Sequence, residues 1–374
     1  MKKLIALSLA CGMAAALAGC GGAPSSAPAS SPEPFNMSTT TPETMPDAGS
    51  STLDTAIPAA PDAAAPATPP GAGFVYSVEP SVTAESIGPL LQMRGDDERG
   101  EFGDDFNAYD MYLDENIFAI TQNGKCGLID TDGVIVLPCE YDSFTVAFDK
   151  DILALKGDAY FEIDEEDGKY TARPVTGSEL PDLQGTAPNP MLIWVPAENT
   201  LYRSEAGDTY FASVYDKKMP CPAMVATETQ KDGDNQFASG LTGWVLTDGV
   251  KAVSEVYDSV GSFSSGIAPV TKDGKAGYID AAGKVVIPLE YDVGDAASVL
   301  PASRPCKATY GTVVLVKDGV WSLCDTTGAA IIPAGTFDAV TPVYKDKAFV
   351  QKDGKWGVVR LTGRYAGDQT GLDD

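Results

Sequence analysis

The stretch Ile267–Asp292, IAPVTKDGKAGYIDAAGKVVIPLEYD, decides the fold class of this 374-residue chain. Two turn sequences, Asp273-Gly274 and Ala281-Ala282-Gly283, separate three short apolar runs in it. Such turns favour hairpins, because glycine tolerates the positive φ that a tight reversal of the chain needs. The stretch therefore predicts an antiparallel meander of three strands, in which Pro288 stops the third strand.

If both turns contain two residues, the register of the meander follows by counting. Ala268 then lies opposite Ile279, and Ile279 lies opposite Val286. Both faces of the meander are apolar, so both faces must be covered. One unit cannot cover itself, and we expect neighbouring copies of the unit to do so.

Copies of the unit recur along the chain as glycine pairs nine residues apart. The clearest pairs are Gly124 and Gly133, Gly240 and Gly249, Gly274 and Gly283, Gly319 and Gly328, and Gly354 and Gly363. An aromatic residue followed by Asp comes after four of them, at Tyr141-Asp142, Tyr257-Asp258, Tyr291-Asp292 and Phe337-Asp338. Weaker copies begin at Gly157 and Gly207, which makes seven candidate units.

The pattern resembles the WG-repeat family, whose units share this Asp-Gly-Lys, Gly and Tyr-Asp spacing. Trp356-Gly357 is an intact copy of the name-giving pair, and other residues occupy the Trp position elsewhere: Cys126, Thr242, Ala276 and Trp321. The resemblance covers residues 115–364. It implies a repeated β architecture, and because the family is mostly non-catalytic it implies a binding protein more than an enzyme.

We therefore predict an all-β fold of tandem antiparallel meanders. Seven units and a closing strand from the N-terminal side suit a propeller-like ring, and an open β-solenoid is the alternative. The expected domains are a lipoprotein signal peptide, a disordered stalk, a transitional segment that supplies a closing strand, the repeat domain and a tail: 1–19, 20–72, 73–115, 116–364 and 365–374. Within the transitional segment, Ala84–Met93 is compatible with a helical turn.

The N-terminus reads as an export signal. Lys2 and Lys3 precede an apolar run that ends in Leu17-Ala18-Gly19-Cys20, which resembles a bacterial lipobox. The Cys20 thiol would accept a diacylglyceryl group and anchor the chain to the cell membrane, facing the extracytoplasmic side. An ordinary signal peptide that happens to contain Cys is the alternative. The following Pro-, Ala-, Ser- and Thr-rich stretch cannot bury enough apolar surface to fold.

Composition excludes several kinds of function. The chain has 53 Asp and Glu against 26 Lys and Arg and carries a formal charge of −27, so it repels nucleic-acid phosphates. It contains no His, which excludes histidine-dependent catalysis and histidine metal ligands. We expect no nucleic-acid partner, no cofactor and no enzymatic activity.

Five cysteines follow Cys20 in the chain: Cys126, Cys139, Cys221, Cys306 and Cys324. Cys126 and Cys139 are symmetric about Asp132-Gly133, so a two-residue turn would place them directly opposite on adjacent strands. This predicts a candidate disulfide, since an oxidising exterior permits one. The alternative is that both are small buried apolar residues.

Recurrent acidic and aromatic residues have two interpretations. Asp130, Asp280 and Asp325 could form a ring of Ca²⁺ ligands, but an Asx-type hydrogen bond that closes each second turn is favoured. In the Tyr-Asp pairs, we expect Tyr to pack between units and Asp to cap the following turn. Trp194 lies in an insertion and is the candidate for an exposed, ligand-contacting aromatic.

The function that we expect is a surface-anchored binding or scaffold module of the bacterial envelope. Its partner would be a protein or a cell-wall glycan, held on a rim formed by the insertions at 165–205 and 293–311. A Ca²⁺-dependent surface protein is one alternative. A glycan hydrolase with two catalytic carboxylates is another, although no spacing in the sequence selects a carboxylate pair.

Overall fold

The structure is a computed structural model that describes residues 73–93, 109–113, 116–147, 150–175, 192–204, 211–214, 220–232, 235–293 and 306–367. Over these ranges it contains 26 β-strands, a 3-10 turn (η3, Gly363–Tyr365) and no α-helix. The prediction of an all-β chain is confirmed. The predicted signal peptide and stalk, with Cys20, lie outside the described residues.

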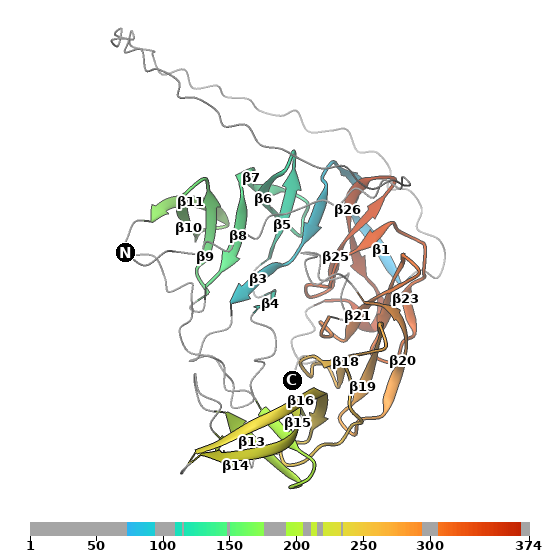
Figure 1. Ribbon diagram of the computed structural model, residues 1–374. Helices are drawn as coiled ribbons and strands as arrows, with labels where there is room; N and C mark the ends of the chain where they lie inside the picture. The colour runs from blue at the N-terminus through green and yellow to red at the C-terminus, as the bar shows by residue number, and fades with distance from the viewer. Residues whose placement is uncertain are drawn as a thin grey trace, which may run out of the picture. The chain divides into compact units, whose positions relative to one another are not determined.

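The strands form six sheets, which we number I to VI in chain order (Figure 1). Sheet I has the order β2 (Ser86–Gly88), β5 (Ile117–Gln122), β6 (Lys125–Asp130), β7 (Ile135–Tyr141). Sheet II has the order β11 (Lys169–Val175), β10 (Ala159–Glu166), β9 (Ile152–Lys156), β8 (Ser143–Val146), β3 (Leu90–Met93), β4 (Tyr109–Tyr112). Sheet III has the order β14 (Phe211–Val214), β13 (Thr200–Ser204), β12 (Leu192–Val195), β15 (Cys221–Asp232), β16 (Asn235–Thr247).

The second half of the chain is more regular. Sheet IV has the order β17 (Ser259–Val260), β18 (Ile267–Lys272), β19 (Lys275–Asp280), β20 (Val285–Asp292), and sheet V has β21 (Thr312–Lys317), β22 (Val320–Asp325), β23 (Ala330–Ile332). Sheet VI has the order β1 (Phe74–Val82), β26 (Lys355–Leu361), β25 (Lys347–Lys352), β24 (Ala339–Val340). Nearly all neighbouring strands are antiparallel, and none of these sheets closes into a barrel.

The predicted length of two residues is confirmed for the first turn of the repeat and is wrong for the second. Ala268 pairs with Ile279, as predicted, and Val270 pairs with Gly277. Ile279, however, pairs with Val285 rather than Val286. The N–H of Asp280 donates to the carbonyl of Lys284, so the second turn holds three residues and ends on Gly283 at φ 74°.

The glycine of the Trp-Gly position lets the third strand bulge across the second. A Cβ built on Gly277 would lie 2.7 Å from the carbonyl oxygen of Ile287, and one on Gly357 would lie 2.5 Å from that of Val78. No side chain fits at either position. Sheet V has Ser322 here, and its third strand, β23, ends at Ile332 opposite Leu323 before reaching it.

Strand β1 takes the place of the third strand in sheet VI. It pairs with β26 from Phe74 opposite Leu361 to Val82 opposite Trp356, although the two strands lie at opposite ends of the domain sequence (Figure 1). A Cβ on Gly133, in the second turn of sheet I, would lie 3.2 Å from Val78. The N-terminal segment thus completes the last repeat unit and lies against the first.

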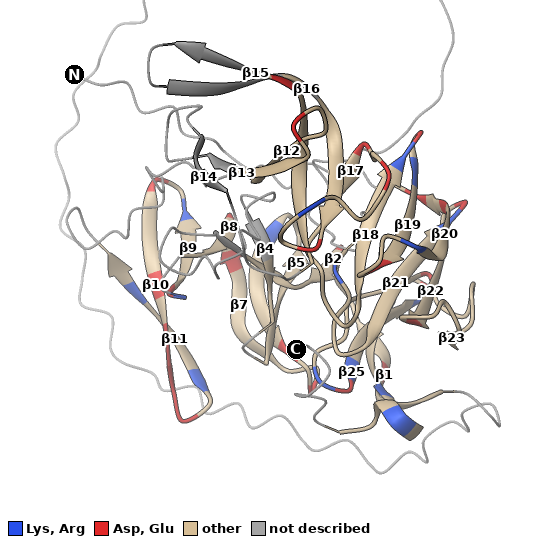
Figure 2. Ribbon diagram, turned by 90° about the horizontal axis from the view of Figure 1, so that it is seen from below, with Lys and Arg blue, Asp and Glu red and all other residues tan. Residues whose placement is uncertain are grey.

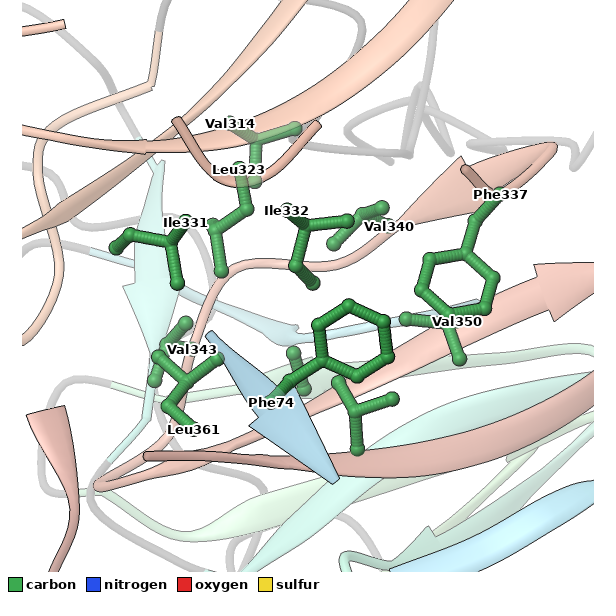
Figure 3. Close-up of a cluster of buried hydrophobic side chains, with 12 residues drawn as sticks. Phe74, Val314, Leu323, Ile331, Ile332, Phe337, Val340, Val343, Val350 and Leu361 are labelled. Atoms are coloured by element: carbon green, nitrogen blue, oxygen red, sulfur yellow. The ribbon is translucent and has the colours of Figure 1, made fainter. Parts of the chain in front are cut away.

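Apolar clusters join the sheets face to face. One cluster combines Phe118 of sheet I with Phe349 and Trp356 of sheet VI, and others join sheets I and II, V and VI, IV and V, and III and IV. In the cluster between sheets V and VI, Phe74 of β1 lies among aliphatic side chains and near Phe337 (Figure 3). Among the described residues no cluster joins sheets II and III, which are the sheets extended by insertions.

The middle of the repeat array differs from the prediction. Gly207 lies outside the described residues, and Gly240 lies inside β16 instead of at a first turn. The two expected units around these glycines are replaced by the single sheet III. The insertion at 165–205 was expected to form loops, but it contributes β11, β12 and β13, and the segment Ala84–Met93 forms β2 and β3 rather than a helical turn.

Candidate functional site

The aspartate of each Tyr-Asp pair caps the first turn of the following unit. Asp142 Oδ2 accepts a hydrogen bond from the backbone N–H of Gly157 at 2.7 Å, and Asp292 Oδ2 accepts one from Gly319 at 2.9 Å. Asp258 Oδ2 accepts the N–H of Asp273 at 2.8 Å. We call these three contacts, with the side chains around them, the charged joints between sheets I and II, III and IV, and IV and V.

Lysines form ion pairs with the joint aspartate at two of the charged joints. Lys125 of sheet I is ion-paired with Asp142, and Lys275 of sheet IV with Asp292 at 3.4 Å. The Lys125 ammonium and the Gly157 N–H lower the pKa of Asp142, and the Gly319 N–H and Lys275 lower the pKa of Asp292. A carboxylate with such partners is held in its charged form.

A second lysine lies over the tyrosine of the pair. Lys156 Nζ lies 5.7 Å from the Tyr141 ring centre and 2.9 Å from Glu140, and Lys272 Nζ lies 5.6 Å from the Tyr257 ring centre and 2.6 Å from Glu255. Lys317 and Glu290 repeat the ion pair at 2.9 Å. Tyr141 and Tyr257 are buried between sheets, so the expected structural role of the Tyr-Asp pairs is confirmed.

The three recurrent aspartates close their own turns. Oδ1 of Asp130, Asp280 and Asp325 each accepts backbone N–H groups two and four residues ahead, at 2.9–3.0 Å. Asp325 is also buried and bonded to Arg364 and Tyr365. Burial raises the pKa of Asp325, but the hydrogen bonds from Thr327 and Ala329 outweigh it and lower the pKa overall. Across the described part of the chain, no three acidic or Cys side chains converge as metal ligands.

The predicted bridge between Cys126 and Cys139 does not form. Cys126 lies opposite Tyr141, because the second turn has three residues and the third strand bulges past Gly127. Cys126 Sγ instead lies 3.7 Å from the Thr121 hydroxyl, and Cys139 Sγ faces the carbonyl of Ile120 at 3.8 Å. Cys221, the first residue of β15, is buried opposite Thr247 of β16, and burial raises its pKa to about 11, so it is a poor nucleophile.

Trp194 was expected to be an exposed aromatic, and this expectation is wrong. Trp194 lies in the middle strand of sheet III, is 7% exposed and packs with Leu201, Cys221 and Val225. The insertion was expected to be a loop, but its strand β12 pairs with both β13 and β15, and the indole packs against side chains of these strands. Trp356 is buried and Trp321 is half-buried, as expected for the inner position of the repeat.

Two features of the site were missed from the sequence. Three lysines of the charged joints lie one or two residues before a first-turn glycine, and two lie one residue after one: Lys156, Lys272, Lys317, Lys125 and Lys275. This spacing could have predicted their pairing with Glu-Tyr-Asp. Most of the exposed charge elsewhere carries no repeat signal, as in Glu165, Glu166 and Asp167 at the tip of the β10–β11 hairpin (Figure 2). Within the described ranges, no helix is long and apolar enough to cross a membrane.

Comparison with known proteins identifies the repeat. The WG containing repeat matches residues 127–154, 252–275, 277–294 and 321–356, so these repeats occur at four places in the chain. No curated protein sequence matches the chain.

Similar solved structures share little sequence with this chain. They include a gluconolactonase from Xanthomonas campestris (10% identity, 77% of this chain and 89% of that one, TM-score 0.27). They also include PorZ, a surface component of the type-IX secretion system of Porphyromonas gingivalis (11% identity, 75% of this chain and 38% of that one, TM-score 0.31). A third is virginiamycin B lyase from Staphylococcus aureus (15% identity, 66% and 77%, TM-score 0.20).

Proposed function

We propose that this chain, a β protein with WG containing repeats at four places, is a non-catalytic binding or scaffold module. The observation behind the proposal is that the recurrent polar residues make structural contacts within the repeats. The joint carboxylates and lysines hold neighbouring sheets together, and the second-turn aspartates close their own turns. Because the recurring side chains are engaged in structure, the repeat itself supplies a rigid support.

A ligand would then contact the parts that the repeat does not require. Those parts gather in sheets II and III, where the hairpin β3–β4 and the meander β12–β14 extend the sheets beyond the repeat pattern. We place the binding surface there, and expect a protein or a cell-wall glycan as the partner. The strong negative charge of the chain disfavours polyanions.

The experiment is a pull-down from bacterial envelope extract with the immobilised full chain. Residues 20–72 alone serve as the control bait, because the proposal assigns binding to the repeat domain. We expect a protein or glycan to be enriched on the full chain over this control. Equal recovery on both baits would contradict the proposal.

We further propose that Cys20 carries a lipid that anchors the chain on the extracytoplasmic side of the cell membrane. The support is the lipobox-like sequence and the unfolded character expected of the stretch that follows it. The full chain should then partition into the detergent phase of a cloud-point extraction, and Cys20→Ala should move it to the aqueous phase. Partition of both forms into the same phase would contradict lipidation.

A further inference from the structure

The joint between sheets VI and I is built from different residues than the charged joints. Val82 of β1 corresponds to Tyr141 of β7 and Tyr291 of β20, because each of these residues pairs with the residue at the Trp position of its own unit. Thr83 therefore occupies the position of the joint aspartate, and its hydroxyl oxygen accepts a hydrogen bond from the Lys355 ammonium. We call this contact region, Val82 to Glu85 with its partners, the closing joint.

The partner strand of the closing joint is also changed. Gln122 ends β5 where Lys156 ends β9, and its amide donates to the carbonyl of Thr83 at 2.6 Å. The Gly124 N–H bonds to Glu85 Oε2 at 3.2 Å, longer than the matching contact of Asp142. The closing joint therefore lacks the lysine over a tyrosine and the lysine–aspartate pair.

Strand β1 also holds an acidic residue where other third strands hold proline. The atoms nearest a Cβ on Gly357 come from Val78, Glu79 and Pro80, and those nearest Gly277 come from Ile287, Pro288 and Leu289, so Glu79 matches Pro288. Oε1 of Glu79 is buried and has no hydrogen-bond partner. Burial raises the pKa of Glu79, as expected for a desolvated carboxylate.

The other end of β1 is held firmly. Phe74 is buried in the cluster between sheets V and VI, with its ring centre 5.4 Å from that of Phe337 (Figure 3). The carbonyl of Gly73 accepts the N–H of Thr362 at 2.9 Å. The closing joint is held instead by hydrogen bonds: the Ala84 carbonyl accepts the indole N–H of Trp356 at 3.2 Å, and the Glu85 N–H donates to the Thr121 carbonyl at 2.9 Å.

We propose that β1 is a releasable latch: the closing joint opens before the charged joints, while β25 and β26 stay paired. An exposed ion pair and a lysine–aromatic contact together change a local opening equilibrium by roughly tenfold, and the unpartnered carboxylate oxygen adds to the difference. Opening exposes the edge of β26, which then becomes available to a competing strand.

Hydrogen exchange of the full chain, followed by mass spectrometry of peptic fragments, tests the latch. In low salt, amides of residues 78–86 should exchange roughly tenfold faster than those of residues 137–145 in the matching third strand and joint of sheet I. At about 1 M salt the difference should shrink, because the charged joints are screened and the closing joint is not. Equal exchange of the two segments in low salt would overturn the proposal.

Exchanging the joint residues provides the matched control. Thr83→Asp with Gln122→Lys installs the charged pattern at the closing joint and should slow exchange there. Asp142→Thr with Lys156→Gln installs the closing pattern between sheets I and II and should speed exchange there. Glu79→Ala tests the latch without altering the joint and should slow exchange of β1. If exchange of residues 78–86 stays unchanged in both the joint variant and Glu79→Ala, the latch is excluded.

Discussion

At the scale of single residues, the glycine of each Trp-Gly position controls how closely the third strand approaches the second. Gly277 has the carbonyl of Ile287 and the backbone of Pro288 within 3 Å of where a Cβ would stand. Backbone cannot move aside as a flexible side chain can. The residue requirement of the repeat is therefore steric, and the buried Trp position beside it tolerates Cys or Ala.

This steric requirement predicts the effect of adding one methyl group. Gly277→Ala should destabilise the domain by about 1–3 kcal/mol, because β20 must shift away from β19. Gly274→Asn is the control, since Gly274 has open space around it and Asn accepts a positive φ. Urea unfolding of the two variants gives the comparison, and equal loss of stability would contradict the explanation.

The joint aspartates predict an acid-sensitive fold. Their partners lower the pKa of Asp142 and Asp292 in the folded state, so the unfolded chain binds these protons more tightly. The stability that they contribute is present above the unfolded pKa of about 4 and is lost as pH falls through the folded values. As the pH is lowered below about 4, the urea concentration at the unfolding midpoint should decrease. It should decrease less steeply in the double variant Asp142→Asn, Asp292→Asn. If the urea midpoint of that variant depends on pH as steeply as that of the unmodified chain, these two carboxylates do not cause the acid sensitivity.

At the scale of elements, the sequence was most informative where the repeat is regular. The Asp-Gly turns, the two apolar faces and the first-hairpin register of Ile267–Asp280 were predicted, because turn chemistry and alternation act locally. The register of the third strand was not, since Gly283 ends a three-residue turn and Gly277 admits a bulge. The length of this turn and the bulge both depend on how closely two backbones approach each other, and the residue pattern does not predict that distance.

The insertions show the same limit. Trp194 was expected to be exposed because its segment lacks the repeat, yet parallel pairing of β12 with β15 buries it. Pairing between segments about 30 residues apart in sequence carries no local signal. The predicted disulfide between Cys126 and Cys139 was wrong for a related reason, because the prediction assumed a two-residue turn.

The closing element predicts a large effect from one truncation. Phe74→Ala should cost about 3–5 kcal/mol, because Phe74 fills the cluster between sheets V and VI and anchors β1 against Phe337. Val75→Ala on the same strand is the control, since Val75 is exposed and should change stability by no more than about 0.5 kcal/mol. A Phe74→Ala chain as stable as the Val75→Ala chain would show that β1 is not held by this contact.

At the scale of the whole molecule, the recurrent aspartates of the described repeat units are used in structural contacts. The second-turn aspartates bond to their own turns, and the joint aspartates bond to the next unit. This predicts that the domain gains no stability from Ca²⁺. Melting curves with Ca²⁺ and with EDTA should coincide, and calorimetry should show no saturable heat; a Ca²⁺-dependent shift would favour the alternative of a Ca²⁺-dependent surface protein.

A strand from the start of the domain completes the last repeat unit. The most direct measurement is a cross-link between Val75→Cys and Arg360→Cys, which lie opposite each other on β1 and β26. Mild oxidation should yield a monomer with this one intramolecular disulfide, seen as a mobility shift on a non-reducing gel and as a linked peptide pair. The control pair Val75→Cys and Lys355→Cys, at the far end of β26, should stay reduced. Failure of the first pair to link, or linking only between molecules, would contradict the account.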